Sequence, residues 1–405
     1  MDAEEKTCRL HCGSPQKMKR ILIFSLAYYP HVGGAEVALK EITDRVFDIE
    51  FHMVTMRFSG AEAREEKIDN MFVHRIGNGN GRLSKFLFQF SAARKAARLH
   101  RQYHFDAVWA MMAHSSGVPA GLFKTFHPEV KYLLTLQEGD PPEYVERLMR
   151  PLWPLFKRGF TKADMVVGES TFLGRWARRM GFAGPLEVIP NGMDAEWFAR
   201  TPAESELETI HAKIGKKEGE TWLIHTGRLV HKNALDIVIR ALPFLPASVH
   251  FFMLGDGPDK DALTKLADAL GVSARVHFHP YVPLADIPNY LKTCDIFIRP
   301  SRSEGMGNSF IEAMAAELPV IATQEGGIAD FLFDAKRNPN KETTGWAVNK
   351  DSPEQITEAV EDILAYPDKV VQVKVTAKRR AMETYDWGLI AREMQSAFDK
   401  TFENR

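Results

Sequence analysis

The decisive stretch of sequence runs Ile298-Arg299-Pro300-Ser301-Arg302-Ser303-Glu304-Gly305-Met306-Gly307-Asn308-Ser309-Phe310-Ile311-Glu312. It predicts a buried strand that ends near Pro300, a loop that contains Gly305 and Gly307, and a helix that begins near Ser309. The first N–H groups of a helix lack intrahelical partners and carry partial positive charge, so they stabilise a phosphate without a metal. Glycine lets such a ligand approach the backbone closely. The stretch therefore indicates a phosphate-binding turn in an α/β sheet.

Two carboxylates flank the expected helix start. Glu304 lies in the loop, and Glu312 lies one turn inside the helix. Carboxylates accept hydrogen bonds, and the hydroxyl groups of a sugar or a ribose are suitable donors. A structural interpretation competes for Glu312, because Ser309-x-x-Glu312 fits a capping box that only satisfies the helix end. For Glu304 the competing interpretation is a solvated loop acid.

The same alternation of short apolar runs and helical patterns extends along the chain on both sides of this stretch. Branched apolar runs that end in glycine turns and lead into helices are typical of parallel strands in a doubly wound sheet. The first series of runs comprises residues 21–26, 51–54, 107–111, 132–136, 165–167 and 186–189. The second series comprises residues 222–226, 249–254, 276–278, 296–298, 319–322 and 345–348.

A strong turn signal, Pro190-Asn191-Gly192-Met193-Asp194, separates the two series. We therefore expect an α/β protein of two Rossmann-like, doubly wound domains that face each other across a cleft. The predicted parts are a flexible polar leader at 1–17, an N-terminal domain at 18–194, a C-terminal domain at 195–385, and a helix at 386–405 that packs back on the N-terminal domain.

Composition narrows the class of protein. The 405 residues carry a net charge of -1, which argues against bulk binding of nucleic acid. Cys8, Cys12 and Cys294 show neither a disulfide framework nor metal-ligand spacing. That usage suits a reducing cytoplasm. The chain lacks an apolar run of the roughly 18 residues that a membrane span needs, and its first 17 residues lack the apolar core of a secretory signal. We expect a cytoplasmic protein.

Two stretches are basic and amphipathic. Residues 82–105 contain six Lys or Arg and no acid, with phenylalanine and leucine interleaved, and residues 147–162 have a similar character. Such stretches can lie on an anionic membrane surface, which predicts peripheral contact with the inner membrane surface. The competing interpretation is a helix with an ordinary solvated basic face.

Several separated motifs, taken in order, resemble the family 4 retaining glycosyltransferases of the GT-B fold. Ser303-Glu304-Gly305-Met306-Gly307-Asn308-Ser309-Phe310-Ile311-Glu312 is similar to the family's donor-site motif. The other matching motifs are Tyr29-Pro30-His31-Val32-Gly33-Gly34-Ala35-Glu36, Val188-Ile189-Pro190-Asn191-Gly192-Met193-Asp194, Thr226-Gly227-Arg228-Leu229-Val230 and Leu254-Gly255-Asp256-Gly257-Pro258. The resemblance extends from Met18 over nearly the whole chain.

The resemblance implies a role for each matching residue. Glu304 would contact hydroxyls of the transferred sugar, and Glu312 would hold the nucleotide ribose. Arg228 and Lys232 would neutralise the diphosphate leaving group, which is easier to expel when cations share its charge. The remaining donor-binding residues would be Gly33, Gly34, Tyr281, Val282, Gly305, Met306, Gly307, Asn308 and Ser309. The resemblance implies that no divalent metal is needed, so we expect neither a metal nor a cofactor, only a nucleoside-diphosphate sugar as co-substrate.

Two departures from the family pattern concern the catalytic cations and the acceptor side. Many relatives place Lys five residues after the Arg and follow it with Gly, whereas here Lys232 comes four residues after Arg228 and Asn233 follows. Relatives also often have a His where this chain has Gln137, which cannot titrate near neutral pH. The candidates for the acceptor side, which the first domain would form, are His114, Gln137, Glu138 and Asp140.

The resulting prediction is a metal-independent retaining glycosyltransferase. Its acceptor, whether a glycan, a lipid-linked molecule or a small molecule, is left open by these residues. Two alternatives use the same architecture: another sugar-nucleotide enzyme, such as an epimerase or a phosphorylase-like protein, and a binding protein that has lost catalysis.

Overall fold

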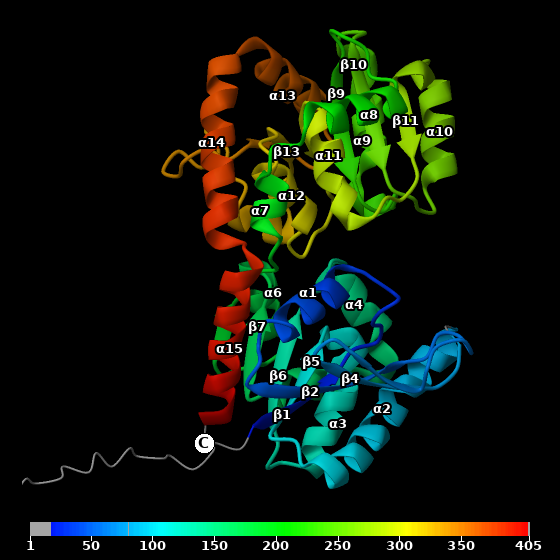
Figure 1. The fold of residues 1–405 in the computed structure, drawn as a ribbon, viewed down its shortest axis with the longest axis vertical. Coiled ribbons are helices and arrows are strands. Elements are labelled where there is room, and N and C mark those ends of the chain that lie inside the picture. Colours follow the sequence, from blue (N-terminus) through cyan, green and yellow to red (C-terminus); the bar gives the residue numbers. More distant parts are fainter. Residues whose placement is uncertain (1–17, 80, 404–405) are drawn as a thin grey trace, which may run out of the picture.

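The computed structural model describes residues 18–79 and 81–403. It consists of two α/β domains, one above the other in Figure 1, with a long helical segment along one side. The predicted leader, with Cys8 and Cys12, lies outside the described residues. No helix in the described part of the chain is both long and apolar enough to cross a membrane.

The N-terminal domain is built on a sheet of order β3-β4-β2-β1-β5-β6-β7-β8, in which only the β3–β4 pair is antiparallel. Its strands are β1 (Lys19–Phe24), β2 (Ile49–Met56), β3 (Glu65–Ile68), β4 (Met71–Ile76), β5 (Ala107–Met111), β6 (Lys131–Leu136), β7 (Met165–Gly168) and β8 (Leu186–Val188). Its helices are α1 (Gly34–Thr43), α2 (Arg82–Tyr103), η1 (Ala113–Gly117), α3 (Val118–Phe126), α4 (Pro142–Leu148), η2 (Arg150–Leu152), α5 (Trp153–Thr161) and α6 (Thr171–Arg179).

The hairpin of β3 and β4 is the part of this sheet that the apolar pattern did not predict. β3 reads Glu-Glu-Lys-Ile and is largely exposed, so it has no apolar run. It pairs antiparallel with β4 through a tight turn in which Asp69 has a positive φ of 48°. Exposed edge strands of this kind hydrogen-bond to one neighbour only and are often charged.

The C-terminal domain has a fully parallel sheet of order β11-β10-β9-β12-β13-β14, the strand order of a Rossmann fold. Its strands are β9 (Thr221–Thr226), β10 (Val249–Leu254), β11 (Val276–His279), β12 (Ile296–Arg299), β13 (Val320–Ala322) and β14 (Trp346–Ala347). Its helices are α7 (Ala195–Ala199), α8 (Glu204–Ile214), η3 (His231–Asn233), α9 (Leu235–Ala241), η4 (Leu242–Phe244), α10 (Lys260–Ala269), η5 (Ser273–Arg275), η6 (Leu284–Asp286), α11 (Ile287–Thr293), α12 (Asn308–Ala315), η7 (Gly326–Asp330), α13 (Pro353–Ala365) and α14 (Pro367–Thr384).

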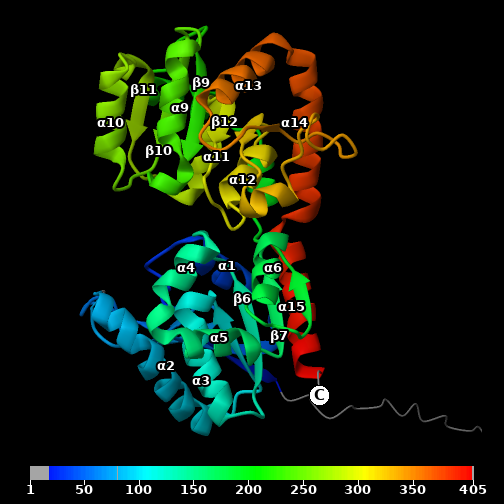
Figure 2. The same cartoon turned by 180° about the vertical axis from the view of Figure 1, so that it is seen from behind.

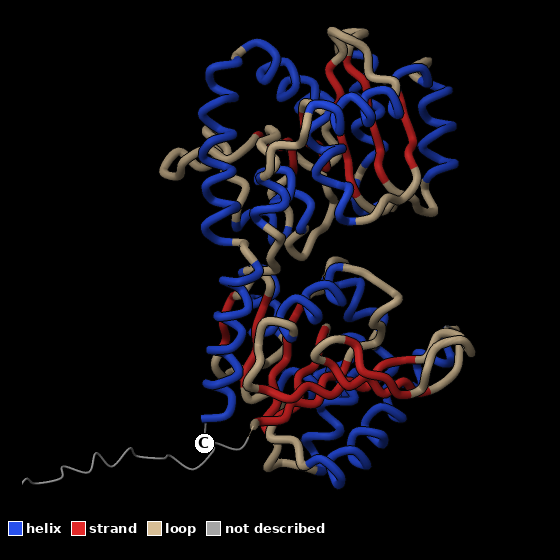
Figure 3. Tube along the Cα trace, in the orientation of Figure 1, coloured by secondary structure: helices blue, strands red, loops and turns tan. Residues whose placement is uncertain are grey.

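Both sheets are covered by helices on both faces, as the tube view shows (Figure 3). Each face has its own cluster of buried apolar side chains, two clusters in each domain. A strand that is buried on both faces needs an unbroken apolar run. This requirement explains why the predicted runs correspond closely to the central strands.

The chain crosses between the domains twice, at neighbouring points. The first crossing follows β8, and the second joins α14 to α15 (Trp387–Glu403). The two crossings pair at Met193, whose N–H donates to the Tyr385 carbonyl at 2.7 Å and whose carbonyl accepts from the Trp387 N–H at 3.2 Å. The helix α15 then packs on the N-terminal sheet, where its Phe398 ring lies 5.1 Å from that of Trp109.

The strand order places two loops at the edge where ligands bind in such folds. In each sheet the order reverses between two central strands, β1 and β5 in one domain and β9 and β12 in the other. Ligands of open α/β sheets bind beyond the carboxyl ends of the strands at this switch point. In the C-terminal domain, these ends lead into the turn at Gly227 and the loop before α12.

Candidate active site

The loop between β12 and α12 forms the core of the candidate site. Helix α12 begins at Asn308, one residue earlier than expected, with Gly307 as its N-cap residue at φ 92° and ψ 85°. No side chain caps this helix start. The capping-box interpretation of Ser309 and Glu312 is therefore wrong, and the first N–H groups of α12 are available to an anion.

Glu312 lies half-buried on α12 with no hydrogen-bond partner for its carboxylate among the described residues. Burial raises the pKa of Glu312 to about 7, and the positive charge of Arg299 opposes that rise. A half-buried carboxylate without a protein partner is an unsatisfied acceptor. It can accept a hydrogen bond from a ligand hydroxyl.

Arg299 is a residue of the site that the sequence interpretation missed. It is the last residue of β12 and is only 6% exposed. Its Nη2 donates to Glu304 Oε2 at 3.0 Å, and its guanidinium lies 4.2 Å from the centre of the Phe310 ring. The available signal was a charged residue at the end of an otherwise apolar buried strand, where an arginine is rare unless it is paired.

The turn after β9 brings the two predicted cations to the same region. Asn233 Nδ2 donates to the Arg228 carbonyl at 2.7 Å and so fixes this turn. The guanidinium of Arg228 is exposed and has no partner among the described residues. Lys232 reaches across to the other domain, where its Nζ donates to the Gly139 carbonyl at 2.9 Å and lies 3.8 Å from Asp140 Oδ1.

Glu304 and Lys232 both lie close to Gly139. A Cβ at Gly139 would lie 3.5 Å from Glu304 Oε1 and 2.5 Å from Lys232 Nζ. Glu304, the acid predicted to contact the sugar, and Lys232, one of the predicted cations, are thus adjacent, although Lys232 comes one residue earlier than in many relatives. The shortened spacing is compatible with this position because Lys232 lies in the short helix η3.

The two domains approach each other closely at Gly305. A Cβ at this position would collide with Glu169 Oε1 and would lie 2.6 Å from the Glu138 carbonyl oxygen, so only glycine fits. Glu169 follows β7 and is a second residue that the sequence interpretation missed. Its carboxylate accepts from Asn191 Nδ2 at 3.1 Å. Burial, followed by the nearby Glu304 and Glu138, raises the pKa of Glu169 well above its usual range.

The four acceptor-side candidates differ in whether their side chains already hydrogen-bond to other protein groups and in how exposed they are. Gln137 Nε2 donates to Asn191 Oδ1 at 2.7 Å, and the Glu138 carboxylate accepts from the backbone N–H groups of His114 at 3.3 Å and of Gln137 at 3.1 Å. Asp140 is 56% exposed at its side chain, and His114 is 28% exposed. Asp140 and His114 are therefore the two that can reach a ligand.

The other predicted donor residues differ in their burial and in their contacts with this loop. Met306 and Val282 are buried in one apolar cluster, and the Asn191 N–H donates to Met306 Sδ at 3.3 Å. Tyr281 is 76% exposed. Gly33 and Gly34 lie at the start of α1, on the side of the N-terminal domain that faces the other domain (Figure 1), but no contact joins them to the α12 loop. Asn308 and Ser309 form the first turn of α12.

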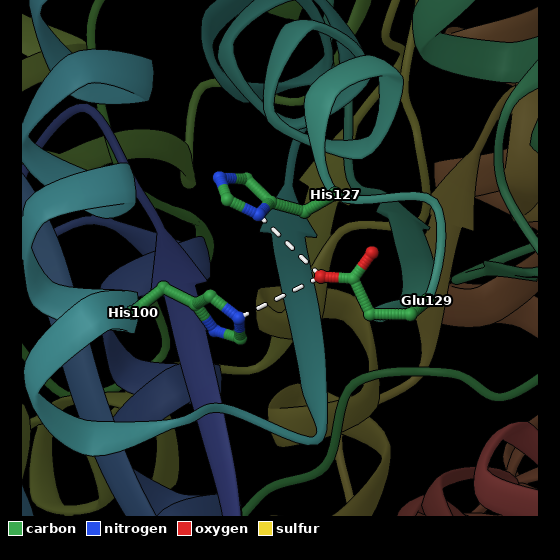
Figure 4. Close-up of side chains that lie close together, drawn as sticks. All are labelled: His100, His127 and Glu129. Atoms are coloured by element: carbon green, nitrogen blue, oxygen red, sulfur yellow. Dashed lines mark ion pairs between the residues drawn. The ribbon is translucent and has the colours of Figure 1, made fainter.

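A separate cluster of His100, His127 and Glu129 lies in the N-terminal domain, and Figure 4 shows both imidazoles directed at one carboxylate oxygen. Glu129 Oε1 lies 3.8 Å from His100 Nε2 and 3.5 Å from His127 Nδ1. The Phe105 backbone N–H donates to His100 Nδ1 at 3.1 Å, so the proton of a neutral His100 is on Nε2. A metal would need a lone pair on Nε2, so the hydrogen bond at Nδ1 argues against a metal site in this cluster.

Two Rossmann-like domains that meet along one boundary form the architecture of the GT-B glycosyltransferases. Two family models cover most of the chain: "Glycosyltransferase Family 4" matches residues 32–197 and "Glycosyl transferases group 1" matches residues 206–380. The chain belongs to the family 4 glycosyltransferases.

Curated relatives and solved structures agree with this assignment. The GDP-mannose-dependent alpha-(1-6)-phosphatidylinositol monomannoside mannosyltransferase of Mycobacterium tuberculosis is 24% identical over 93% of this chain and 97% of that protein. The enzyme of the same name from Mycolicibacterium smegmatis is 30% identical, over 56% of this chain and 59% of that protein. Sucrose-phosphate synthase from Thermosynechococcus elongatus has a TM-score of 0.80 at 18% identity, over 95% of this chain and 99% of that one. Anabaena HepE in complex with UDP-glucose has a TM-score of 0.76 at 18% identity, over 94% and 99% of the two chains.

Proposed function

We propose that this enzyme transfers a sugar from a nucleoside-diphosphate sugar to an acceptor with retention of the anomeric configuration and without a metal. The observation that carries the proposal is the uncapped start of α12, which lies beside Glu304 at the switch point of the C-terminal sheet. A helix start with free N–H groups provides a site for a diphosphate.

The proposed donor position assigns one part of the ligand to each element. The diphosphate would meet the first N–H groups of α12 and the cations of Arg228 and Lys232. The transferred sugar would donate hydroxyl hydrogen bonds to Glu304, and the ribose would donate to the free carboxylate of Glu312. The base would lie near the backbone of residues 281–282.

The chemistry of this arrangement is the stabilisation of a leaving group. As the bond to the sugar breaks, negative charge grows on the diphosphate, and preorganised cations and N–H groups stabilise that charge without a metal. Closure of the domains would exclude water from the bond that breaks. Retention implies that the acceptor attacks from the face that the diphosphate leaves, between Glu304 and the half-buried His114 and the exposed Asp140.

The relatives support a nucleotide-sugar donor and suggest the probes for testing it. The mycobacterial relatives are described as GDP-mannose-dependent, and HepE was solved with UDP-glucose. We expect wild-type protein to be stabilised thermally by one of these two donors, because a ligand that binds only the folded state raises its stability. Release of nucleoside diphosphate is then measured with a panel of acceptors.

The Glu304→Gln variant tests catalysis at the proposed site. Its transfer rate should fall on the order of 10²-fold or more, because it removes a charge next to the reacting centre. Glu342→Gln, an exposed acid that pairs with Arg379, is the matched control and should retain the wild-type rate. A Glu304→Gln variant with the wild-type rate would refute the assignment. An altered donor sugar in the absence of acceptor would instead indicate an epimerase, and binding without any turnover a silent binding protein.

We also propose an anionic membrane as a partner of helix α2. Leu83, Phe86, Leu87 and Phe90 are 70%, 44%, 54% and 40% exposed, and their spacing places them on one helix face. Arg94, Arg98 and Arg101 are exposed and continue that face along the helix. Helices α2 and α5 both pack against α3, on the same side of the N-terminal domain (Figure 2). Lys95 is less available for contact with a membrane than the neighbouring arginines, because its Nζ lies 2.9 Å from Glu65 Oε1.

Sedimentation with vesicles tests this surface. The protein should sediment with phosphatidylglycerol–phosphatidylcholine vesicles and remain in the supernatant with phosphatidylcholine alone. Leu87→Ser with Phe90→Ser, and separately Arg94→Gln with Arg98→Gln, should each reduce binding. The matched control is Phe126→Ser, which removes an exposed ring from the end of α3. Equal sedimentation of the variants and wild type, or no sedimentation at all, would contradict the proposal.

A further inference from the structure

Arg299 lies behind the proposed donor site, in contact with both elements that form it. It ends β12, yet its side chain is directed at the loop and first turn that follow. An unpaired charge in such a buried position is costly, and a paired one still loses its hydration. An arginine there without a structural partner on its own strand calls for a local explanation.

The side chain is fixed on three sides. Its Nη2 donates to Glu304 Oε2 at 3.0 Å, and its guanidinium stacks 4.2 Å from the centre of the Phe310 ring. The third side is the backbone at Gly307, where a Cβ would lie 2.6 Å from Nη2. Glycine is therefore the only residue type at position 307 that lets the helix start pass so close to this guanidinium.

The charged and titratable groups around Arg299 are Glu304, Glu312 and His225. Neither ring nitrogen of His225 has a hydrogen-bond partner. Burial, and then the charge of Arg299, lowers the pKa of His225 to about 3, so its imidazole is neutral. His225 cannot provide a positive charge at neutral pH. Among these groups Arg299 alone provides one, between the acid on the loop and the acid on the helix.

We propose that Arg299 is a positioning residue that couples the two donor acids: it holds the Glu304 carboxylate in place for the transferred sugar and supplies the counter-charge for Glu312 at the ribose. This inference rests on the donor site proposed above. Arg299 acts on the two carboxylates from the buried interior of the domain, whereas Arg228 and Lys232 would contact the diphosphate.

Arg299 contacts Glu304, and its charge acts on Glu312 without a direct contact; these two interactions predict two separate effects. Through Glu304 it controls the geometry at the reacting sugar, and a small displacement there lowers kcat. Through Glu312 it controls how well the ribose is bound, because only the ionised carboxylate offers all its acceptor positions. Burial raises the pKa of Glu312 to about 7, and the charge of Arg299 opposes that rise. Loss of Arg299 should therefore raise this pKa further. The acidic limb, the pH range in which donor binding weakens as Glu312 is protonated, should then move to higher pH.

The experiment compares wild type with Arg299→Met, Arg299→Lys and a control, Arg275→Met. Arg275 is a partly buried arginine of the same domain whose guanidinium donates to backbone carbonyls, among them that of Leu242 at 2.6 Å. Calorimetric titration with GDP-mannose and with UDP-glucose, between about pH 5 and about pH 9, gives the pH limb of binding. Steady-state assays with the donor that binds give kcat and KM.

Arg299→Met should lower kcat on the order of 10²-fold. It should weaken donor binding about fivefold at pH 7, as expected for a limb that moves by about one pH unit. Arg299→Lys should retain the position of the limb but lose part of kcat, because an ammonium supplies charge without the planar fork. Arg275→Met should leave the limb unchanged.

The inference is overturned if Arg299→Met retains the wild-type limb and kcat, or if its limb moves no further than that of Arg275→Met. If Arg299→Met does not fold, Arg299→Met with Glu304→Gln removes both partners of the buried pair, and the binding limb remains the readout. A wild-type protein that binds neither donor would refute the proposed function itself, an outcome distinct from the failure of the Arg299 inference.

Discussion

At the scale of single residues, the candidate site concentrates charge where the surrounding structure makes charge costly. Glu169 lies at the domain boundary, Arg299 and Glu312 belong to β12 and α12 of the C-terminal domain, and burial shifts the pKa of each toward its neutral form. Perturbed groups that gather at one place are a feature of functional sites. The ion pair of Arg299 and Glu304 shows that part of this cost is offset locally.

Glu312 allows a test by stability. Because the pKa of Glu312 is raised to about 7, the folded protein binds this proton more tightly than the unfolded chain does. The ionised form therefore destabilises the fold, by an amount that grows as the pH rises from the ordinary glutamate value of 4.5 toward about 7. Without ligand, Glu312→Gln should be more stable than wild type by about 1–2 kcal/mol above pH 7.

Urea denaturation at several pH values measures this difference, which should disappear below the ordinary glutamate pKa. The same variant should bind the donor more weakly at pH 8 (about 1 kcal/mol, one lost charged hydrogen bond). A variant that is less stable than wild type at high pH would show that Glu312 has a structural partner after all.

Gly307 allows a second test, of the backbone at the helix start. With φ at 92° and a Cβ that would lie 2.6 Å from Arg299 Nη2, Gly307→Ala should lower the free energy of unfolding by about 2 kcal/mol or more. Gly60→Ala is the control, because a Cβ there meets no atom within 4 Å and the φ is not positive. Equal stability of the two variants would contradict the geometry described for this helix start.

At the scale of elements, the sequence predicted the strands that have an apolar pattern and missed a strand that forms only by pairing with its neighbour. The central strands appear as unbroken apolar runs because they are buried on both faces, and the predicted run at 107–111 coincides with β5. The strand β3 was missed because its residues are polar and its order comes from β4.

The site could be predicted in part for the same reason. Glu304, Glu312 and the helix start follow one another in a single stretch, so local sequence was enough to find them. Arg299 was hidden within an apolar run, and Glu169 belongs to a different domain. The capping role of Ser309 was a plausible local pattern that failed because Gly307, with no side chain, occupies the N-cap position.

The helix α15 is the last element of the chain, yet it packs on the sheet of the N-terminal domain. Its Phe398 is 1% exposed and packs against Phe51 and Trp109 of the N-terminal sheet. Phe398→Ala should lower the free energy of unfolding by about 3–5 kcal/mol, whereas the exposed Phe126→Ala should change it little. Thermal or chemical denaturation measures both, and a small effect at Phe398 would mean that α15 is only loosely attached.

At the scale of the whole molecule, contacts between the two domains bring the α12 loop and the acceptor-side candidates together. Lys232 bonds to Gly139, Gly305 fits against Glu169, and the Thr171 N–H at the start of α6 donates to Asp330 Oδ2 at 2.7 Å across the same boundary. Each contact joins a residue of one domain to a residue of the other. The relative position of the domains therefore sets the distance between Glu304 and the acceptor-side candidates of the N-terminal domain.

Gly305→Ala tests this dependence. The added methyl group would collide with Glu169, so the domains should remain further apart. We expect kcat to fall on the order of 10²-fold, with a larger radius of gyration in solution scattering and little change in donor binding. An unchanged kcat would show that closure at Gly305 is not required for transfer.

The central claim is that a nucleoside-diphosphate sugar binds at the start of α12, between Glu304 and Arg228. Hydrogen–deuterium exchange measures this most directly, because it requires no acceptor. Addition of GDP-mannose or UDP-glucose should slow exchange at residues 305–311 and at the turn of residues 226–233, and Arg228→Ala should abolish both effects at the same donor concentration. Protection confined to other segments, or protection that persists unchanged in Arg228→Ala, would contradict the account.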